Sequence, residues 1–248
     1  MSTDTRGRAR IGVFVPFTNT NLEPDMMLLR PAGTSLHFAR LGGYDADEIP
    51  NEHQMAQLGS SDMEEPLRLI QGVRPDVVIY GCTSATLAHG PAFDNDLRAR
   101  IAAQSGAKTV TAASALIYAL QSLGLRRVGF ASPYVPTLND EAIGFLASEG
   151  FETVGRADFE GTLDNVGQGA LSPQDVFELG IRADHPQAEA VVLSCTDMRS
   201  VEVIAELETK LGKPVVTSNQ AMMFQVIDMA HLGPAPKGFG QLFERISA

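Results

Sequence analysis

The sequence predicts an α/β protein of two similar halves, each with a parallel four-stranded sheet flanked by helices. The prediction rests on three blocks that recur in the same order at offsets of 117, 113 and 106 residues. RIGVFVP at 10–16 recurs as RVGFASP at 127–133, DVVIYGCTSA at 76–85 as EAVVLSCTDM at 189–198, and TVTAASA at 109–115 as VVTSNQA at 215–221. Each block is a short apolar run before a helical pattern, which is typical of a buried parallel strand.

Within each half, strands and helices alternate. In the first half we expect strands at 10–15, 44–49, 76–81 and 107–111, helices at about 24–41 and 62–72, and a helix directly after Cys82. In the second half we expect strands at 127–132, 151–157, 189–194 and 213–217, helices at 136–149 and 173–182, and a helix directly after Cys195. Gly42, Gly43 and Gly150 are interpreted as helix stops before the second strand of each half. This alternation implies right-handed crossovers between parallel strands.

The fourth strand of each half runs into an apolar helix that we expect to cross to the other half. The predicted organisation is therefore two pseudo-symmetric flavodoxin-like domains with the active site between them. The first domain would be discontinuous, comprising 1–111 plus 222–248, and the second would comprise 112–221.

Composition excludes several classes of function. The chain has 248 residues and a formal net charge of −11, with no basic cluster of the kind that binds nucleic acid. Its apolar runs are of strand length, which predicts no membrane span, and the polar amino terminus predicts a cytoplasmic location. Five scattered histidines and two cysteines show no metal-ligand spacing. No glycine-rich nucleotide motif is present, so we expect no metal and no cofactor.

The two cysteines occupy the same place in the repeated unit. Cys82 and Cys195 each follow a third strand, where ligands bind in open α/β sheets, and each precedes an expected helix. The N–H groups at a helix amino terminus would lower the thiol pKa by about one unit. Backbone or hydroxyl donors of the adjoining residues would hold a substrate carboxylate: Thr83, Ser84, Thr196 and Asp197. Burial as small apolar side chains, or a disulfide, are the alternatives.

Three further polar residues follow predicted strands or lie in a glycine-rich loop. Asn19 and Tyr134 end the first strand of each half, and Asn165 lies in GTLDNVGQG. From the residues alone, Asn19 is equally consistent with a turn and Tyr134 with a cap on the core, whereas for Asn165 a turn is the favoured interpretation.

Several motifs resemble the aspartate/glutamate racemase superfamily, and within it the branch of maleate cis–trans isomerases and arylmalonate decarboxylases. The motifs are VPFTNTNLEPD at 15–25, YGCTSAT at 80–86, SPYVPTLND at 132–140, LDN at 163–165, LSCTDMRSVEVI at 193–204 and LGKPVVTSNQA at 211–221. The resemblance implies that Cys82 and Cys195 are the catalytic pair. It also implies that Asn19, Tyr134 and Asn165 hold the substrate carboxylates.

The implied reaction is the cofactor-independent isomerisation of maleate to fumarate in a homo-oligomer, a dimer or tetramer. Cys82 would add to the double bond of the small dicarboxylate and Cys195 would handle the proton. The decarboxylases of this branch keep only the second cysteine, whereas this chain has both.

Two alternatives stay open. TDMRSVE after Cys195 differs from the Val-Gln-Met-Pro type segment of some isomerases. A two-cysteine racemase, or a decarboxylase, would act instead on an amino acid, a hydantoin, an arylmalonate or an ectoine-pathway substrate. A non-catalytic, two-lobed protein that binds a small ligand is the alternative from another class.

Overall fold

The computed structural model describes residues 7–42, 47–59 and 63–246. Its first sheet is parallel and has the order β2-β1-β3-β4, which is the flavodoxin-like order. The strands are β1 (Ala9–Pro16), β2 (Thr34–Leu41), β3 (Val77–Tyr80) and β4 (Lys108–Thr111). The helices are α1 (Leu22–Leu29), α2 (Glu52–Gly59), α3 (Glu64–Gln71), α4 (Thr83–Leu87), α5 (Gly90–Ser105) and α6 (Ala112–Leu123).

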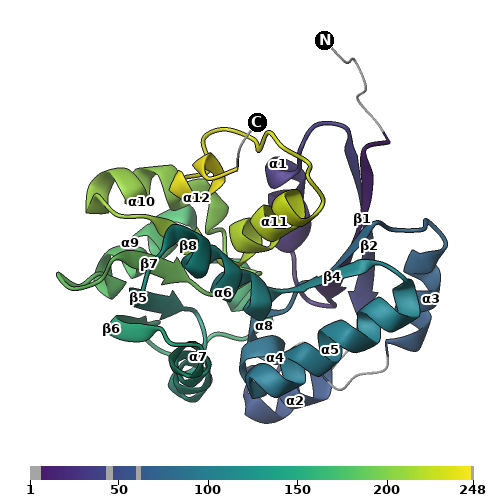
Figure 1. Ribbon diagram of the computed structural model, residues 1–248. Coiled ribbons are helices and arrows are strands. Elements are labelled where there is room, and N and C mark those ends of the chain that lie inside the picture. The colour runs from purple at the N-terminus through teal and green to yellow at the C-terminus, as the bar shows by residue number, and fades with distance from the viewer. Residues whose placement is uncertain (1–6, 43–46, 60–62, 247–248) are drawn as a thin grey trace.

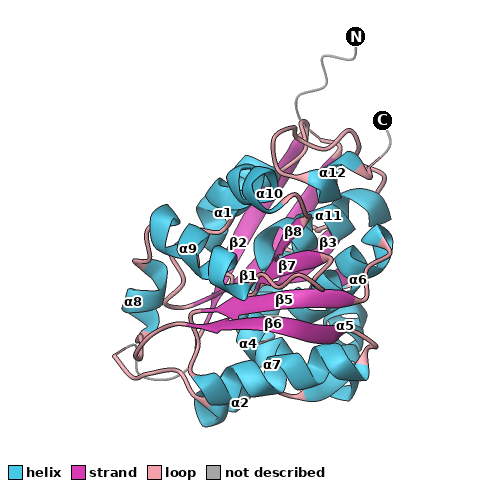
Figure 2. Ribbon diagram, turned by 90° about the vertical axis from the view of Figure 1, so that its left-hand side faces the viewer, coloured by secondary structure: helices cyan, strands magenta, loops and turns pink. Residues whose placement is uncertain are grey.

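The second sheet repeats this arrangement in the order β6-β5-β7-β8, and Figure 2 shows helices on both sides of the strands. Its strands are β5 (Arg127–Ser132), β6 (Glu152–Asp158), β7 (Ala190–Leu193) and β8 (Val215–Thr217). The helices are α7 (Pro136–Ser148), α8 (Asn165–Gly169), α9 (Pro173–Ala183), η1 (Val201–Val203), α10 (Ile204–Leu211), α11 (Ser218–Met229) and α12 (Gln241–Glu244). The predicted fold class is confirmed. Within the described residues, no helix has both the length and the hydropathy of a membrane span.

The two halves share one apolar core. In β1, Ile11 and Val13 belong to a large cluster that includes residues of α1, whereas Phe14 belongs to a smaller cluster formed with α3 and α5. The large cluster continues through α6 and α11 into the second half. These two helices pack against each other between the sheets, and each contacts both β4 and β8 (Figure 1). The domain boundaries stated above stay a prediction.

The predicted helix at about 24–41 is wrong beyond Leu29. The chain turns at Pro31 and Gly33 and then enters β2 as an edge strand. Proline has no N–H to continue a helix, and Gly33 has a positive φ of 82°. The strand expected at 44–49 is partly outside the described residues, and 47–49 are not in a strand.

Helices near the two cysteines also differ from expectation. The helix after Cys82 is confirmed as α4, but Cys195 is followed by a turn at Thr196 and Asp197, and η1 begins only at Val201. Helix α2, which the sequence pattern does not indicate, precedes α3. Cys195 therefore lies at no helix amino terminus.

The end of α9 approaches strand β5 so closely that Gly129 has no room for a side chain. A Cβ on Gly129 of β5 would lie 2.2 Å from the carbonyl oxygen of Ala183 at the end of α9. Gly129→Ala should therefore lower the free energy of unfolding by about 1–3 kcal/mol, measured by urea denaturation. Gly144→Ala is the matched control, since Gly144 lies on α7 with nothing within 4 Å of a Cβ. It should raise stability by up to about 1 kcal/mol; equal effects would contradict this packing.

Candidate active site

Both cysteines line one narrow cavity of about 30 Å³. Cys82 follows β3 and Cys195 follows β7, the corresponding inner strands of the two sheets. The carboxyl ends of both sheets thus meet at this cavity. Both thiols are free, which removes the disulfide alternative.

Most of the predicted binding residues line the cavity. They are Asn19, Ser84, Tyr134, Asn165, Thr196 and Asp197. Thr83 is not among the lining residues, because its hydroxyl donates to Ser218 Oγ at 2.9 Å, at the start of α11. Sequence reasoning missed the rest of the wall, which is Pro16, Phe17, Thr18, Pro50, Met55, Leu58 and Gln168. Asp197 is the only charged residue among the described residues of this lining.

Cys82 is the N-cap residue of α4, and its thiol lies 3.7 Å from the Ser84 hydroxyl. Burial raises the pKa of Cys82, and hydrogen bonds from the backbone N–H groups of Ala85 and Ser84 and from the Ser84 hydroxyl lower it. The helix terminus therefore acts as predicted, but desolvation is the larger effect. The prediction of a lowered thiol pKa is therefore wrong, because the pKa of Cys82 is raised.

The surroundings of Cys195 disfavour its thiolate more strongly than those of Cys82. Burial raises its pKa to about 12, and the charges of Asp197 and Cys82 add to this. Hydrogen bonds from Tyr134 and from the Asp197 N–H oppose the rise, the latter with a distance of 3.3 Å between N and Sγ. The two thiols thus differ, since Cys195 has a carboxylate beside it that disfavours its ionised form.

Tyr134 and Ser84 connect the two sulfurs. The Tyr134 side chain hydrogen bonds with both Cys195 and Ser84, and Ser84 contacts Cys82. Burial and the neighbouring thiols raise the pKa of Tyr134 well above its usual value, so its hydroxyl keeps its proton. Tyr134 and Ser84 thus lie near both sulfurs, and the Ser84 hydroxyl itself donates to Met55 Sδ at 2.8 Å.

Asn19 and Thr196 join the two halves beside the cysteines. Asn19 Nδ2 donates to Thr196 Oγ1 at 3.0 Å, and this hydroxyl donates to the carbonyl oxygen of Gly81 at 3.1 Å. Asn19 Oδ1 accepts from the N–H groups of Asn21 and Leu22. The second hydrogen of the Asn19 amide has no acceptor among the described residues and could be donated to a ligand.

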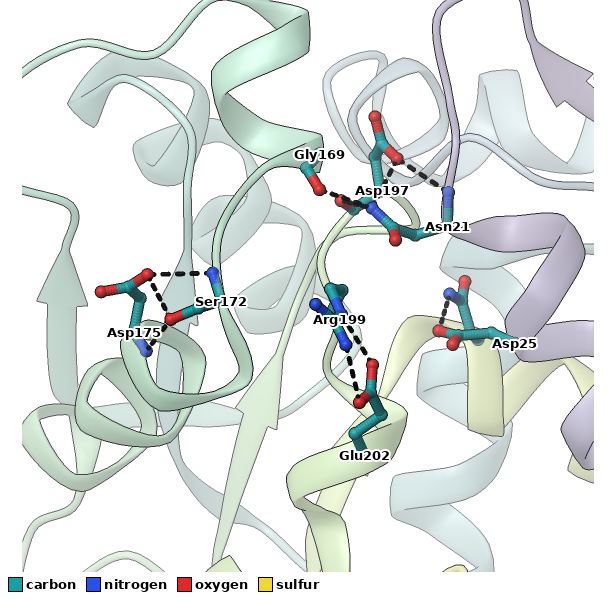
Figure 3. Close-up of polar contacts among 9 residues, drawn as sticks. Asn21, Asp25, Gly169, Ser172, Asp175, Asp197, Arg199 and Glu202 are labelled. Carbon is teal, nitrogen blue, oxygen red and sulfur yellow. Dashed lines mark hydrogen bonds and ion pairs between the residues drawn. The ribbon is translucent and has the colours of Figure 1, made fainter.

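Asp197 is a clamp between the halves. Its Oδ1 accepts hydrogen bonds from Thr20 N at 2.8 Å and from Asn21 N and Nδ2, both at 3.0 Å. Asn21 Nδ2 also donates to the carbonyl oxygens of Asp197 and Gly169 (Figure 3). Because the Asp197 N–H already donates to Cys195, the predicted role of this N–H in holding a substrate carboxylate is not supported. The sequence analysis did not predict that the Asp197 carboxylate accepts hydrogen bonds from Thr20 and Asn21 of the other half.

Asn165 begins α8 and faces the cavity from the second half. Asp164 caps this short helix by accepting a hydrogen bond from Gly167 N. The cap fixes the start of the helix and therefore the position of Asn165, its first residue. Asn165 Nδ2 lies 3.5 Å from the carbonyl oxygen of Glu48. Asn165 is thus placed where an amide could meet a ligand between the halves.

Comparison with known proteins places this geometry in context. A family model described as arylmalonate decarboxylase matches residues 12–243. The maleate isomerase of Geobacillus stearothermophilus is 28% identical over 232 residues, covering 90% of this chain and 92% of the relative. The arylmalonate decarboxylase of Bordetella bronchiseptica is 28% identical over 236 residues, covering 93% and 91%.

A solved structure shares the fold over nearly the whole chain. It is a cysteine-to-serine mutant of the Nocardia farcinica maleate cis-trans isomerase with a covalently bound succinylcysteine intermediate. The TM-score is 0.86 at 25% identity, and the alignment covers 96% of this chain and 99% of that structure.

The clamp can be tested by removing the Asp197 carboxylate. Asp197→Ala should lower the free energy of unfolding by about 1–3 kcal/mol, because Thr20 and Asn21 lose their acceptor in a buried setting. Asp197→Asn is the matched variant, since its amide oxygen can still accept and only the charge is lost. It should keep most of the stability in urea denaturation; equal losses in both variants would contradict the clamp.

Proposed function

The chain belongs to the arylmalonate decarboxylase family, and on that premise we propose that it is a cis–trans isomerase of a small dicarboxylate that converts maleate to fumarate. The observation that carries the proposal is one cavity lined by two free thiols in unequal surroundings. Cys82 has helix N–H donors and Cys195 has a neighbouring carboxylate. This asymmetry favours Cys82 as the nucleophile and Cys195 as the proton donor.

The first step joins the substrate to the protein. The thiolate of Cys82 attacks one carbon of the double bond and forms a C–S bond. The π electrons move to the other carbon, which takes the proton of the Cys195 thiol and leaves a succinyl group on Cys82. Neutral side chains that line the cavity, such as the amides of Asn19 and Asn165, would donate to the substrate carboxylates and stabilise the charge that develops on them.

The second step reverses the first after rotation about the new single bond. The Cys195 thiolate removes a proton, the double bond re-forms with trans geometry, and the C–S bond breaks to regenerate the Cys82 thiolate. Atoms and electrons balance with the two thiols alone. The succinylcysteine adduct of the Nocardia farcinica enzyme supports this course, because it is the intermediate that such an addition produces.

Decarboxylation of an arylmalonate is the second candidate. Phe17, Met55 and Leu58 form an apolar part of the wall, which would suit an apolar substituent. The two reactions separate in one NMR assay, since maleate isomerisation retains both carboxylates whereas decarboxylation releases one as carbon dioxide. A product with one carboxylate fewer would favour this alternative.

The two-thiol mechanism predicts that neither cysteine is dispensable. Cys82→Ser and Cys195→Ala should each lower kcat with maleate by at least about 10²–10⁴-fold, the usual contribution of a proton-transfer or nucleophilic group. Circular dichroism and thermal unfolding should show that the fold is intact. Turnover close to that of the unaltered protein in either variant would overturn the mechanism.

The raised thiol pKa values predict the pH dependence. Below its pKa the Cys82 thiol is protonated and not nucleophilic, and burial shifts this pKa upward. The value of kcat/KM for maleate should therefore increase with pH between about pH 6 and pH 9. Initial rates measured by the absorbance of fumarate check this; a rate that falls across the range would contradict a thiolate nucleophile.

A further inference from the structure

A buried carboxyl group lies outside the cavity but is linked to it. Asp25 of α1 is only 4% exposed, and its side chain meets α11 rather than solvent (Figure 3). Its hydrogen-bond partner is Asn219, whose Nδ2 donates to Asp25 Oδ2 at 2.7 Å. Asp25 does not line the cavity, so the proposed mechanism makes no direct use of it.

Asn219 connects this carboxyl group to the turn that carries Cys195. The same Nδ2 donates its second hydrogen to the carbonyl oxygen of Thr196 at 3.1 Å. Asn219 is fully buried, and its Oδ1 has no hydrogen-bond partner among the described residues. The Asn219 amide therefore links Asp25 to Thr196, the residue next to Cys195, and its own oxygen is left without a donor among the described residues.

The unpartnered oxygen of Asn219 indicates which protonation state of Asp25 completes the hydrogen bonding. A carboxylate can only accept hydrogen bonds, whereas a carboxylic acid can also donate one. A protonated Asp25 would still accept from Asn219 Nδ2 through one oxygen, and its hydroxyl would supply the kind of donor that Asn219 Oδ1 lacks, which would make the two side chains a reciprocal acid–amide pair. An ionised Asp25 leaves Asn219 Oδ1 without a donor and places a charge in the core.

We propose that Asp25 and Asn219 are positioning residues for the Cys195 turn, and that Asp25 acts in this role as a neutral carboxylic acid. The proposal rests on the proposed function in one respect, that Cys195 is a catalytic group. Through the Thr196 carbonyl, the acid–amide pair fixes the backbone that presents the Cys195 thiol. Ionisation of Asp25 loosens that turn.

The charges around Asp25 are compatible with this state at neutral pH. Burial is the main cause that raises the pKa of Asp25 to about 7, opposed by the Asn219 hydrogen bond. The charges of Glu202 and Asp197 raise it further and that of Arg199 lowers it, while Arg199 is itself paired with Glu202 (Figure 3).

Other charged groups on the elements around Asp25 have partners elsewhere. Arg40 of β2 pairs with Glu23 of α1, His37 of β2 contacts Ser35, and Asp228 of α11 hydrogen bonds with Tyr118.

The sign of the effect on folding follows from linkage. Between the usual carboxyl pKa and about 7, the folded chain holds a proton on Asp25 that the unfolded chain releases. Folding stability therefore falls as pH rises through this window. Asp25→Asn should remove that part of the decline.

Two variants at Asp25 separate charge from hydrogen bonding. Asp25→Asn keeps an acceptor and a donor for Asn219 and cannot ionise, whereas Asp25→Leu keeps neither. With maleate, the ratio of kcat for Asp25→Asn to that of the unaltered protein should be near one at about pH 6 and should rise severalfold by about pH 8.5. Asp25→Leu should lower kcat about tenfold, the effect of losing one buried hydrogen bond, with KM changed less than twofold.

A substrate-independent readout comes from the small number of cysteines. In a Cys82→Ser background, Cys195 is the only thiol, and its rate of alkylation by iodoacetamide reports its exposure. Asp25→Leu should raise this rate about tenfold as the buried bond is lost, and Asp25→Asn should leave it near the background value at about pH 6.

Asp94→Asn is the matched control, because Asp94 is also buried and hydrogen-bonded, to Thr111, but lies outside the cavity. It should change neither kcat nor the alkylation rate.

A kcat ratio for Asp25→Asn that does not change with pH would overturn the proposal. An alkylation rate in Asp25→Leu no higher than in Asp94→Asn would also overturn it. If Asp25→Leu does not fold, the Asp25→Asn pH profile decides the matter alone. Failure of the proposed function would look different, since the alkylation results would hold while maleate is not turned over.

Discussion

The site depends on the way in which Thr196 and Asp197 hold two halves of the chain together. The Thr196 hydroxyl accepts from Asn19 and donates to Gly81, next to Cys82, and its carbonyl accepts from Asn219. Asp197 adds the acceptor for the loop after β1. Because these bonds are buried, each one left unmade would cost about 1–3 kcal/mol. Two cysteines that are distant in sequence are kept beside one cavity by this small set of hydrogen bonds.

The fold was predictable wherever a strand is buried on both faces. The inner strands β1, β3, β5 and β7 read as continuous apolar runs, and their repetition indicates two sheets. Strand β2 was missed because it is an edge strand with half-exposed side chains, so that TSLHFARL at 34–41 shows no apolar run. The turn after Cys195 was missed because the corresponding segment after Cys82 is helical, and duplication suggested the same for both.

The sequence predicted which residues lie at the cavity better than it predicted the ionisation and hydrogen bonding of those residues. Strand-end position identifies Cys82, Cys195 and Tyr134, since parallel strands bring their carboxyl ends to one edge. The state of the thiols was not predictable, because desolvation depends on how completely the opposite half covers them. Likewise, nothing in the letters TDM shows that the Asp197 carboxylate crosses to the other half.

The shared core has a consequence for how this chain can be divided. Because α6 and α11 each contact strands of both sheets, a cut between the halves would separate surfaces that are buried against each other. Neither fragment could then bury its own apolar residues, and each would tend to aggregate or remain unfolded. A duplicated architecture that looks modular in sequence is therefore a single cooperative unit in its energetics.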